Sequence, residues 1–286
     1  MTPATGNDVL QKLLLPWQSH DALGNGSAQL GGAVVRASDA AILRTAGDLL
    51  AAYGIGADRV PEATHVDVLR FSLQPLMSLS RPPAEEAPWP TYPTGFLRAP
   101  GLVPVWHLAR TRCPRGTELW RVGADGEQRL VSVFDGAARG WRGAPAYAPP
   151  RALVGPRATW RGEEYAAELL DEAPGEVELV HVGEQVPEGF GPVRPLVAAR
   201  RVPRDECDVF ERVVTAVWRS LTCRVLDRDA TSARILLEHP PADAAARPGV
   251  GEVEPGLFEA TVALEELEAL SGRESHLVTD ADPAGR

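Results

Sequence analysis

The sequence predicts an α+β, β-rich fold: an N-terminal α+β segment, then a β-hairpin region, then two tandem small β-barrel-like modules. Three observations lead to this prediction. The 286 residues include 27 glycines and 26 prolines, an excess typical of folds with many turns and short elements. Several short stretches alternate apolar and polar residues, as strands do. The C-terminal half also repeats part of its own pattern at a spacing of about 58 residues.

Residues 1–100 are predicted to form an α+β domain. The apolar run 9–15 predicts a short helix that Pro16 ends, and the glycine-rich stretch 24–32 predicts a flexible loop. The clearest helix pattern follows Ser38, where apolar residues recur with a helical period.

Short strands are expected after this helix. Residues 66–73 have a strand pattern, and the proline-rich connection 81–93 that follows contains Trp89. Residues 101–150 are predicted to be a β-hairpin region, because the turn signal Ala124-Asp125-Gly126 separates two strand patterns. The proline- and glycine-rich stretch 143–156 predicts a boundary between this region and the next.

The C-terminal half contains an internal repeat. Matching residues recur in order, most of them 58 residues apart and the last two 60 apart: Trp160-Arg161 with Trp218-Arg219, Val177 with Ile235, Leu179 with Leu237, His181 with His239, Val202 with Val262, and Glu206 with Glu266. We therefore expect two β modules, 157–212 and 213–272, each with one core tryptophan and a short terminal helix. Residues 273–286 are predicted to be a disordered tail.

The charge is unevenly distributed along the chain. Residues 151–286 hold 15 arginines against 26 acidic residues, whereas residues 1–150 have a net charge of +1. A concentrated negative field repels nucleic acid and anionic membranes and attracts basic partners. The sequence therefore predicts a basic protein partner, and neither a nucleic acid nor a membrane. The alternative is that the acidic residues serve solubility alone.

Composition also indicates the source and the compartment. Lys12 is the only lysine, and asparagine and isoleucine are scarce, which is typical of a bacterium with a GC-rich genome. Most arginines then stand where lysine would otherwise be and carry little functional information. The sequence has no signal-peptide pattern, no apolar stretch of membrane-spanning length, and three cysteines without paired spacing. These features predict a cytoplasmic protein.

Searches for catalytic motifs give no candidate. The nucleophile elbow, the HExxH zinc motif, the phosphate-binding loop and the dinucleotide-binding fingerprint do not occur, and the six histidines do not cluster. We therefore predict no catalytic residue, no metal ligand and no cofactor. Cys113 lies among arginines that would lower the pKa of its thiol, but no base accompanies it.

One enzymatic alternative remains. Glu252-x-Glu254 with an upstream arginine, here Arg121, is the pattern of ADP-ribosyl-transferring enzymes, which act on NAD-like substrates. The Ser-Thr-Ser strand expected between these elements is missing, and the pair lies in a loop whose first copy lacks it.

The leading hypothesis is a non-enzymatic, cytoplasmic protein-binding protein that uses its acidic modules against a basic partner. One concrete form is an immunity-type protein that masks a basic toxin, since charge complementarity speeds capture. The alternatives are the ADP-ribosyltransferase-type enzyme and a structural component of a bacterial assembly. Loop tryptophans and paired carboxylates supply the candidate interface residues Trp89, Trp141, Glu163, Glu164, Glu252 and Glu254. The identity of the partner and the oligomeric state stay open.

Overall fold

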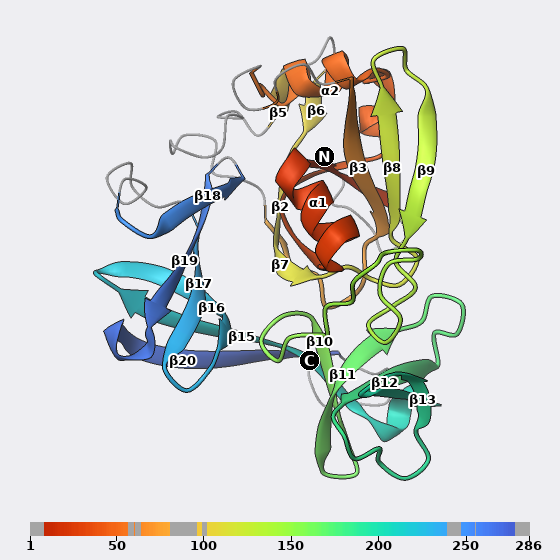
Figure 1. Cartoon of the computed structure of the whole chain (residues 1–286), viewed down its shortest axis with the longest axis vertical. Helices are drawn as coiled ribbons and strands as arrows, with labels where there is room; N and C mark the ends of the chain where they lie inside the picture. Colours follow the sequence, from red (N-terminus) through yellow and green to blue (C-terminus); the bar gives the residue numbers. More distant parts are fainter. Residues whose placement is uncertain are drawn as a thin grey trace, which may run out of the picture.

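The fold is β-rich, with two large antiparallel sheets (Figure 1). The computed structural model describes residues 9–56, 60, 64–80, 96–98, 102–238, 247–254 and 256–277. The predicted α+β, β-rich class is confirmed. Within the described residues neither large sheet closes into a barrel, so the modules that we expected to be barrel-like are open.

The N-terminal part forms a seven-stranded sheet with the order β4-β7-β2-β1-β3-β8-β9. Its strands are β1 (Val9–Leu14), β2 (Gln29–Arg36), β3 (His65–Ser72), β4 (Leu79–Ser80), β7 (Trp106–Arg112), β8 (Glu118–Gly123) and β9 (Gln128–Val133). A separate two-stranded ribbon joins β5 (Phe96–Arg98) to β6 (Leu102–Pro104). Two α-helices, α1 (Pro16–Asn25) and α2 (Ala46–Ala52), accompany the seven-stranded sheet.

The predicted helix over residues 9–15 is wrong, because this run forms the central strand β1. A central strand has a neighbouring strand along each edge and is packed on both faces. Its sequence is therefore continuously apolar and resembles that of a short buried helix. Pro16 does not end a helix; it occupies the first turn of α1, where its missing N–H costs nothing.

The stretch 24–32 is also not the flexible loop that we predicted. Gly26 adopts a left-handed conformation (φ 74°) and ends α1, and Gly31 and Gly32 lie within β2. These glycines allow neighbouring chain to approach closely. A Cβ atom on Gly31 would lie 3.0 Å from the Cα of Arg110 on β7.

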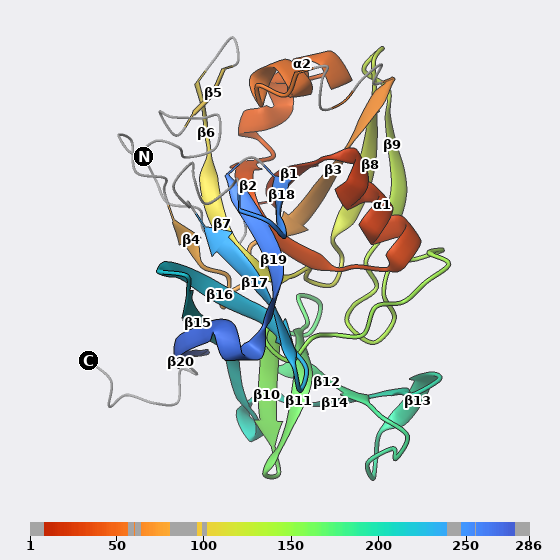
Figure 2. The same cartoon turned by 60° about the vertical axis from the view of Figure 1, so that its left-hand side comes forward.

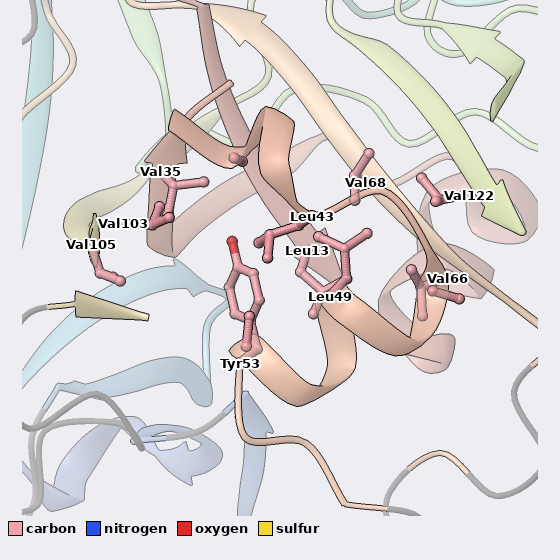
Figure 3. Packing of buried hydrophobic residues seen from close by; sticks show 13 residues of the cluster. Leu13, Val35, Leu43, Leu49, Tyr53, Val66, Val68, Val103, Val105 and Val122 are labelled. Carbon is pink, nitrogen blue, oxygen red and sulfur yellow. The ribbon is translucent and has the colours of Figure 1, made fainter. Parts of the chain in front are cut away.

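The helix predicted after Ser38 is present in two pieces. A short 3-10 helix, Asp39–Ile42, precedes α2, whose first turn is capped because the Asp48 N–H donates to Thr45 Oγ1 over 3.0 Å. Leu49 and Tyr53 pack from this helix onto one face of the sheet, together with valines from four strands (Figure 3). Neither α-helix of the described part is long and apolar enough to cross a membrane.

The predicted division between residues 1–100 and 101–150 does not match the sheets. Strands β7, β8 and β9 belong to the same sheet as β1, β2 and β3. The turn at Ala124-Asp125-Gly126 joins β8 to β9 as predicted. The proline-rich connection 81–93, with Trp89, lies outside the described residues.

The C-terminal part forms one continuous eleven-stranded sheet. Its strands are β10 (Pro156–Trp160), β11 (Glu163–Leu169), β12 (Glu176–Val182), β13 (Gly191–Arg194), β14 (Val197–Pro203), β15 (Asp208–Trp218), β16 (Leu221–Arg228), β17 (Ser232–Glu238), β18 (Val250–Glu254), β19 (Leu257–Ala263) and β20 (Leu267–His276). Strand β15 is shared. Its first half pairs with β10 and its second half with β16, and β20 pairs along most of its length.

The two copies place equivalent residues in equivalent positions. Trp160 and Trp218 are buried and donate from Nε1 to Glu206 (3.3 Å) and Glu266 (3.1 Å). In both copies the next residue is an arginine with a positive φ angle, 53° and 48°, whose guanidinium lies over the tryptophan ring. The strand pairs Thr159–Asp208 and Val217–Glu268 also correspond.

One part of the predicted alignment is shifted by two residues. Arg200 pairs with Leu179, and its counterpart Ala260 pairs with Ile235, so Leu179 corresponds to Ile235. The offset is therefore 56 in this strand, where we predicted 58, and His181 corresponds to Leu237. The faces of the strand are unaffected, because a shift of two residues preserves the side of the sheet.

The predicted boundaries need two corrections. The division at residues 212 and 213 falls inside β15, and residues 273–276 of the predicted tail belong to β20. Residues 278–286 lie outside the described part of the chain. The expected terminal helices are single 3-10 turns, Arg204–Glu206 and Leu264–Glu266.

Replacing the core tryptophan of the second module should destabilise the whole sheet. Trp218→Ala is expected to lower the free energy of unfolding by about 3–5 kcal/mol, because it leaves a large cavity and removes the indole hydrogen bond to Glu266. Urea denaturation followed by circular dichroism measures this change. Leu130→Ala on the exposed face of β9 is the control, with an expected loss of at most about 0.5 kcal/mol. Equal losses in the two variants would contradict the assigned core.

Candidate functional site

A cavity of about 510 Å³ lies where the N-terminal sheet meets the second module. Side chains of β1 and β7 form its floor, and α1 forms one wall. The opposite walls come from the connecting segment 134–154 and from β17, β18 and β19 of the second module. Figure 2 shows the β18–β19 hairpin beside β2 and β7. We call this cavity the cleft.

A buried ion pair joins the two sides of the cleft. Lys12 Nζ on β1 lies 2.5 Å from Glu254 Oε2 at the end of β18, and both side chains are almost fully buried. Gly32 makes this contact possible, because a Cβ atom there would lie 2.3 Å from Glu254 Oε1. The glycine also has a φ angle of +82°, a backbone conformation that residues with a side chain rarely adopt.

A second carboxylate in the cleft accepts hydrogen bonds from two cations. Glu259 on β19 accepts from Arg110 Nη2 of β7 at 3.0 Å and from Arg234 Nε of β17 at 2.6 Å. Two guanidinium groups therefore share one negative charge. This arrangement leaves an excess of positive potential beside Glu259.

Arg151 adds a further cation from the connecting segment. Its Nη1 donates to Asp227 at 3.0 Å. Burial lowers the pKa of Arg151, and the neighbouring charge of Arg234 lowers it further. Burial is the larger cause, and the carboxylates of Asp227 and Glu259 oppose the shift, so an anion bound beside Arg151 and Arg234 would favour their charged forms.

Unused hydrogen-bond donors lie in the floor. Arg112 is buried and donates from Nη2 to the carbonyl oxygens of Pro156 (3.3 Å) and Ala167. Its Nε and Nη1 atoms, and Nε of Arg110, are buried and have no hydrogen-bond partner among the described residues. These three atoms have almost no accessible surface, so they help to concentrate positive charge beneath the cleft without bordering its open space.

Aromatic rings form the apolar part of the walls. Trp17 at the start of α1 donates from Nε1 to the Val253 carbonyl at 2.9 Å, which ties the helix to β18. Phe134 and Trp141 pack against each other with ring centroids 5.4 Å apart, and Trp141 Nε1 donates to the Ser27 carbonyl at 2.8 Å. The cleft therefore combines flat apolar surfaces with guanidinium groups.

The charge of the cleft is opposite to that of the protein. Asp21 and Glu259 line it, and Glu254 and Asp227 pair with two of its cations, whereas five cationic side chains line it: Lys12, Arg110, Arg112, Arg151 and Arg234. The whole chain has a net charge of −10. Such a local concentration of cations favours an anionic occupant.

The candidate interface residues are found in different environments. Trp141 and Glu254 are only 4% and 5% exposed, so neither offers its side chain to a partner in this structure. Both are held inside the cleft region, by the contacts to Ser27 and Lys12. Glu163, Glu164 and Glu252 are exposed on strands, and Trp89 lies outside the described residues.

The described contacts do not bring together Arg121 and Glu254, the residues of the ADP-ribosyltransferase pattern. Arg121 makes two hydrogen bonds to Asp67, at 2.8 and 3.0 Å, whereas Glu254 pairs with Lys12. Among the described residues no group of His, Cys, Asp and Glu side chains has the arrangement of a metal site.

The predicted effect on Cys113 is reversed. Its thiol lines the cleft but is buried, and burial raises its pKa to about 12 despite the nearby arginines. Desolvation thus outweighs the attraction of Arg112 for a thiolate.

Sequence reasoning missed the cationic residues of the cleft. Arg110, Arg112, Arg151 and Arg234 were among the arginines that composition led us to set aside. Lys12 carried one signal that could have identified it: the only lysine of the chain interrupts an apolar run.

Breaking the Lys12–Glu254 pair should be costly. Lys12→Met is expected to lower the free energy of unfolding by about 3–5 kcal/mol, because Glu254 is left buried without its cation. Adding Glu254→Gln removes the second charge and should recover much of the loss. Urea denaturation of both single variants and the double variant measures the coupling. Additive losses would show that the two groups do not interact.

The thiols should be unreactive while the protein is folded. Burial raises the pKa of Cys113 to about 12 and of Cys207 and Cys223 to about 11, so little thiolate exists at pH 8. Labelling with an aromatic disulfide reagent should be slow in buffer and fast in urea for all three cysteines. Rapid modification of Cys113 in the folded protein, located by mass spectrometry, would contradict this.

Comparisons with known proteins give no relative from which a function could be transferred. No protein-family model, no curated protein and no solved structure matches the chain. The side chains of the cleft are therefore the basis on which its function is inferred.

Proposed function

We propose that the protein binds a small organic anion in the cleft between the N-terminal sheet and the second module. The observation that carries this proposal is the set of cationic side chains that line the cleft: Lys12, Arg110, Arg112, Arg151 and Arg234. A carboxylate, sulfonate or phosphate group would form charge-assisted hydrogen bonds with such side chains.

Size and wall chemistry support a ring-bearing ligand. The volume of about 510 Å³ is within the range of small-molecule sites. Trp17, Phe134 and Trp141 offer flat apolar surfaces next to the cations. We therefore propose a ligand that combines a negative group with an aromatic or other flat ring.

The cytoplasm is part of this proposal. Cys113, Cys207 and Cys223 are all free thiols, which supports a reducing compartment. Capture of a basic partner protein, suggested by the charge of the second half, stays a prediction that the cleft does not address.

An anionic fluorescent dye tests the proposal. Anilinonaphthalene sulfonate carries a ring system and one negative charge, and its fluorescence rises in an apolar site. We expect one saturable site, with affinity at least tenfold higher than for N-phenyl-1-naphthylamine, the uncharged analogue. Arg234→Gln should lower the affinity for the sulfonate about tenfold, which corresponds to about 1.4 kcal/mol.

The matched control is Arg129→Gln at an exposed position of β9, which removes the same charge outside the cleft. It should leave the affinity within about twofold of the parent. Added salt should weaken sulfonate binding and leave the uncharged dye unaffected. Equal binding of both dyes, or an unchanged affinity in Arg234→Gln, would overturn the proposal.

A further inference from the structure

The outer face of the first module carries a groove that is separate from the cleft. Its volume is about 580 Å³. Arg157 of β10, Glu164 and Ala166 of β11, and Val180 and Val182 of β12 line it from one face of the sheet. Pro150 and the loop 185–187 form its sides.

The groove presents apolar side chains to solvent. Val182 is 45% exposed, and Val186 in the bordering loop is 50% exposed. Leu196 lies close by, because the Gly183 N–H donates to its carbonyl oxygen at 2.8 Å, and its side chain is 59% exposed. Figure 2 shows β13, which leads into Leu196, extending away from the rest of the protein. Exposed apolar side chains that gather in this way mark interaction surfaces more often than single ones do.

The second module contains a face equivalent to the one that carries the groove. The strand pair Arg157–Ala166 corresponds to Thr215–Arg224, and Val180 corresponds to Leu236 through the pairs Ala166–Val180 and Arg224–Leu236.

In the second copy this face is covered by the N-terminal part of the protein. Thr215, Thr222, Arg224 and Leu236 line a cavity of about 370 Å³ together with Leu76, Ser78 and Ala109. Residues 76 and 78 lie between β3 and β4, so they belong to a connecting segment. In the second copy this face therefore meets another stretch of polypeptide. In the first copy Ala137, Ala138 and Tyr147 pack against Ala166 and Val180, so the groove is the part of the face left open beside Glu164, Val182 and Val186.

The charge around the open groove is negative. Glu163, at one end of the groove, and Glu184 and Glu188, beside the loop 185–187, are exposed and make no ion pair with another described residue. Arg157, the cation in the groove, is held by Glu164 at 2.5 Å. In the second copy Leu221 and Thr222 replace Glu163 and Glu164, so the acidic pair is specific to the first copy.

We propose that this groove docks an extended segment of a partner protein that combines apolar residues with lysine or arginine. The apolar side chains would contact Val182 and Val186, and the basic ones would lie against Glu163 and the acidic loop. The site is independent of the anion-binding cleft, and its charge preference is the opposite.

Selection from a displayed library of random twelve-residue peptides against the full chain tests this inference. Enriched peptides should carry at least two basic residues among apolar ones. Val186→Asp and Glu163→Arg, both at exposed positions, should each lower the affinity of the best peptide at least tenfold, measured by fluorescence polarisation. Glu252→Arg, an equal charge reversal on the second module, should change it less than twofold.

The other outcomes overturn the inference. These are the absence of enrichment, enrichment of acidic peptides, and binding that survives Val186→Asp. A dimer in sedimentation that Val186→Asp dissociates would instead assign the groove to a second copy of this chain. Sulfonate-dye binding should be the same in Val186→Asp as in the parent, so failure here is distinguishable from failure of the cleft proposal.

Discussion

The ion pair between Lys12 and Glu254 fixes how the second module meets the N-terminal sheet. Glu254 ends β18, and its carboxylate reaches Lys12 only because Gly32 leaves the space above β2 empty. A buried pair of this kind tolerates little displacement, since either charge alone would be strongly unfavourable. Glu259 lies on β19, next to β18, and Arg234 lies on β17, one strand further, so the positions of both follow from this contact. The cleft is thus a consequence of how two separate sheets are joined.

The two copies of the module have the same core and different surroundings. They share the buried tryptophan, the arginine over its ring and the glutamate that accepts from its indole N–H. Their outer faces have different neighbours: Leu76, Ser78 and Ala109 lie against threonine and arginine side chains in the second copy, whereas Ala137 and Ala138 cover Ala166 and Val180 in the first and leave a groove beside Glu164 and Val182. Both copies thus keep the same core and contact different parts of the chain.

The sequence allowed the β-rich class, the short strands, the hairpin at Ala124-Asp125-Gly126 and most repeat positions to be predicted. These depend on local pattern and on turn chemistry. The strand β1 was mistaken for a helix, because a central strand buried on both faces shows no alternation. The two-residue shift at Leu179 could not be seen either, since apolar residues recur along both strands.

The cleft was beyond prediction for a different reason. Arg110, Arg112, Arg151 and Arg234 are far apart in sequence, and no local motif connects them. Only the pairing of strands and the docking of the second module bring them together. In a chain where arginine replaces lysine almost everywhere, composition obscures the few arginines that gather in the cleft. Arg110 and Arg112 differ from most of the others in being buried.

The shared strand β15 has a consequence for how this protein could be divided. Its eleven residues contribute Val209 to the core of the first copy and Ala216 and Trp218 to the core of the second. No peptide bond between the copies can therefore be cut without removing a strand from one of them. The tandem is expected to melt as a single cooperative unit, and a gene fragment that encodes either half alone would lack part of its own interior.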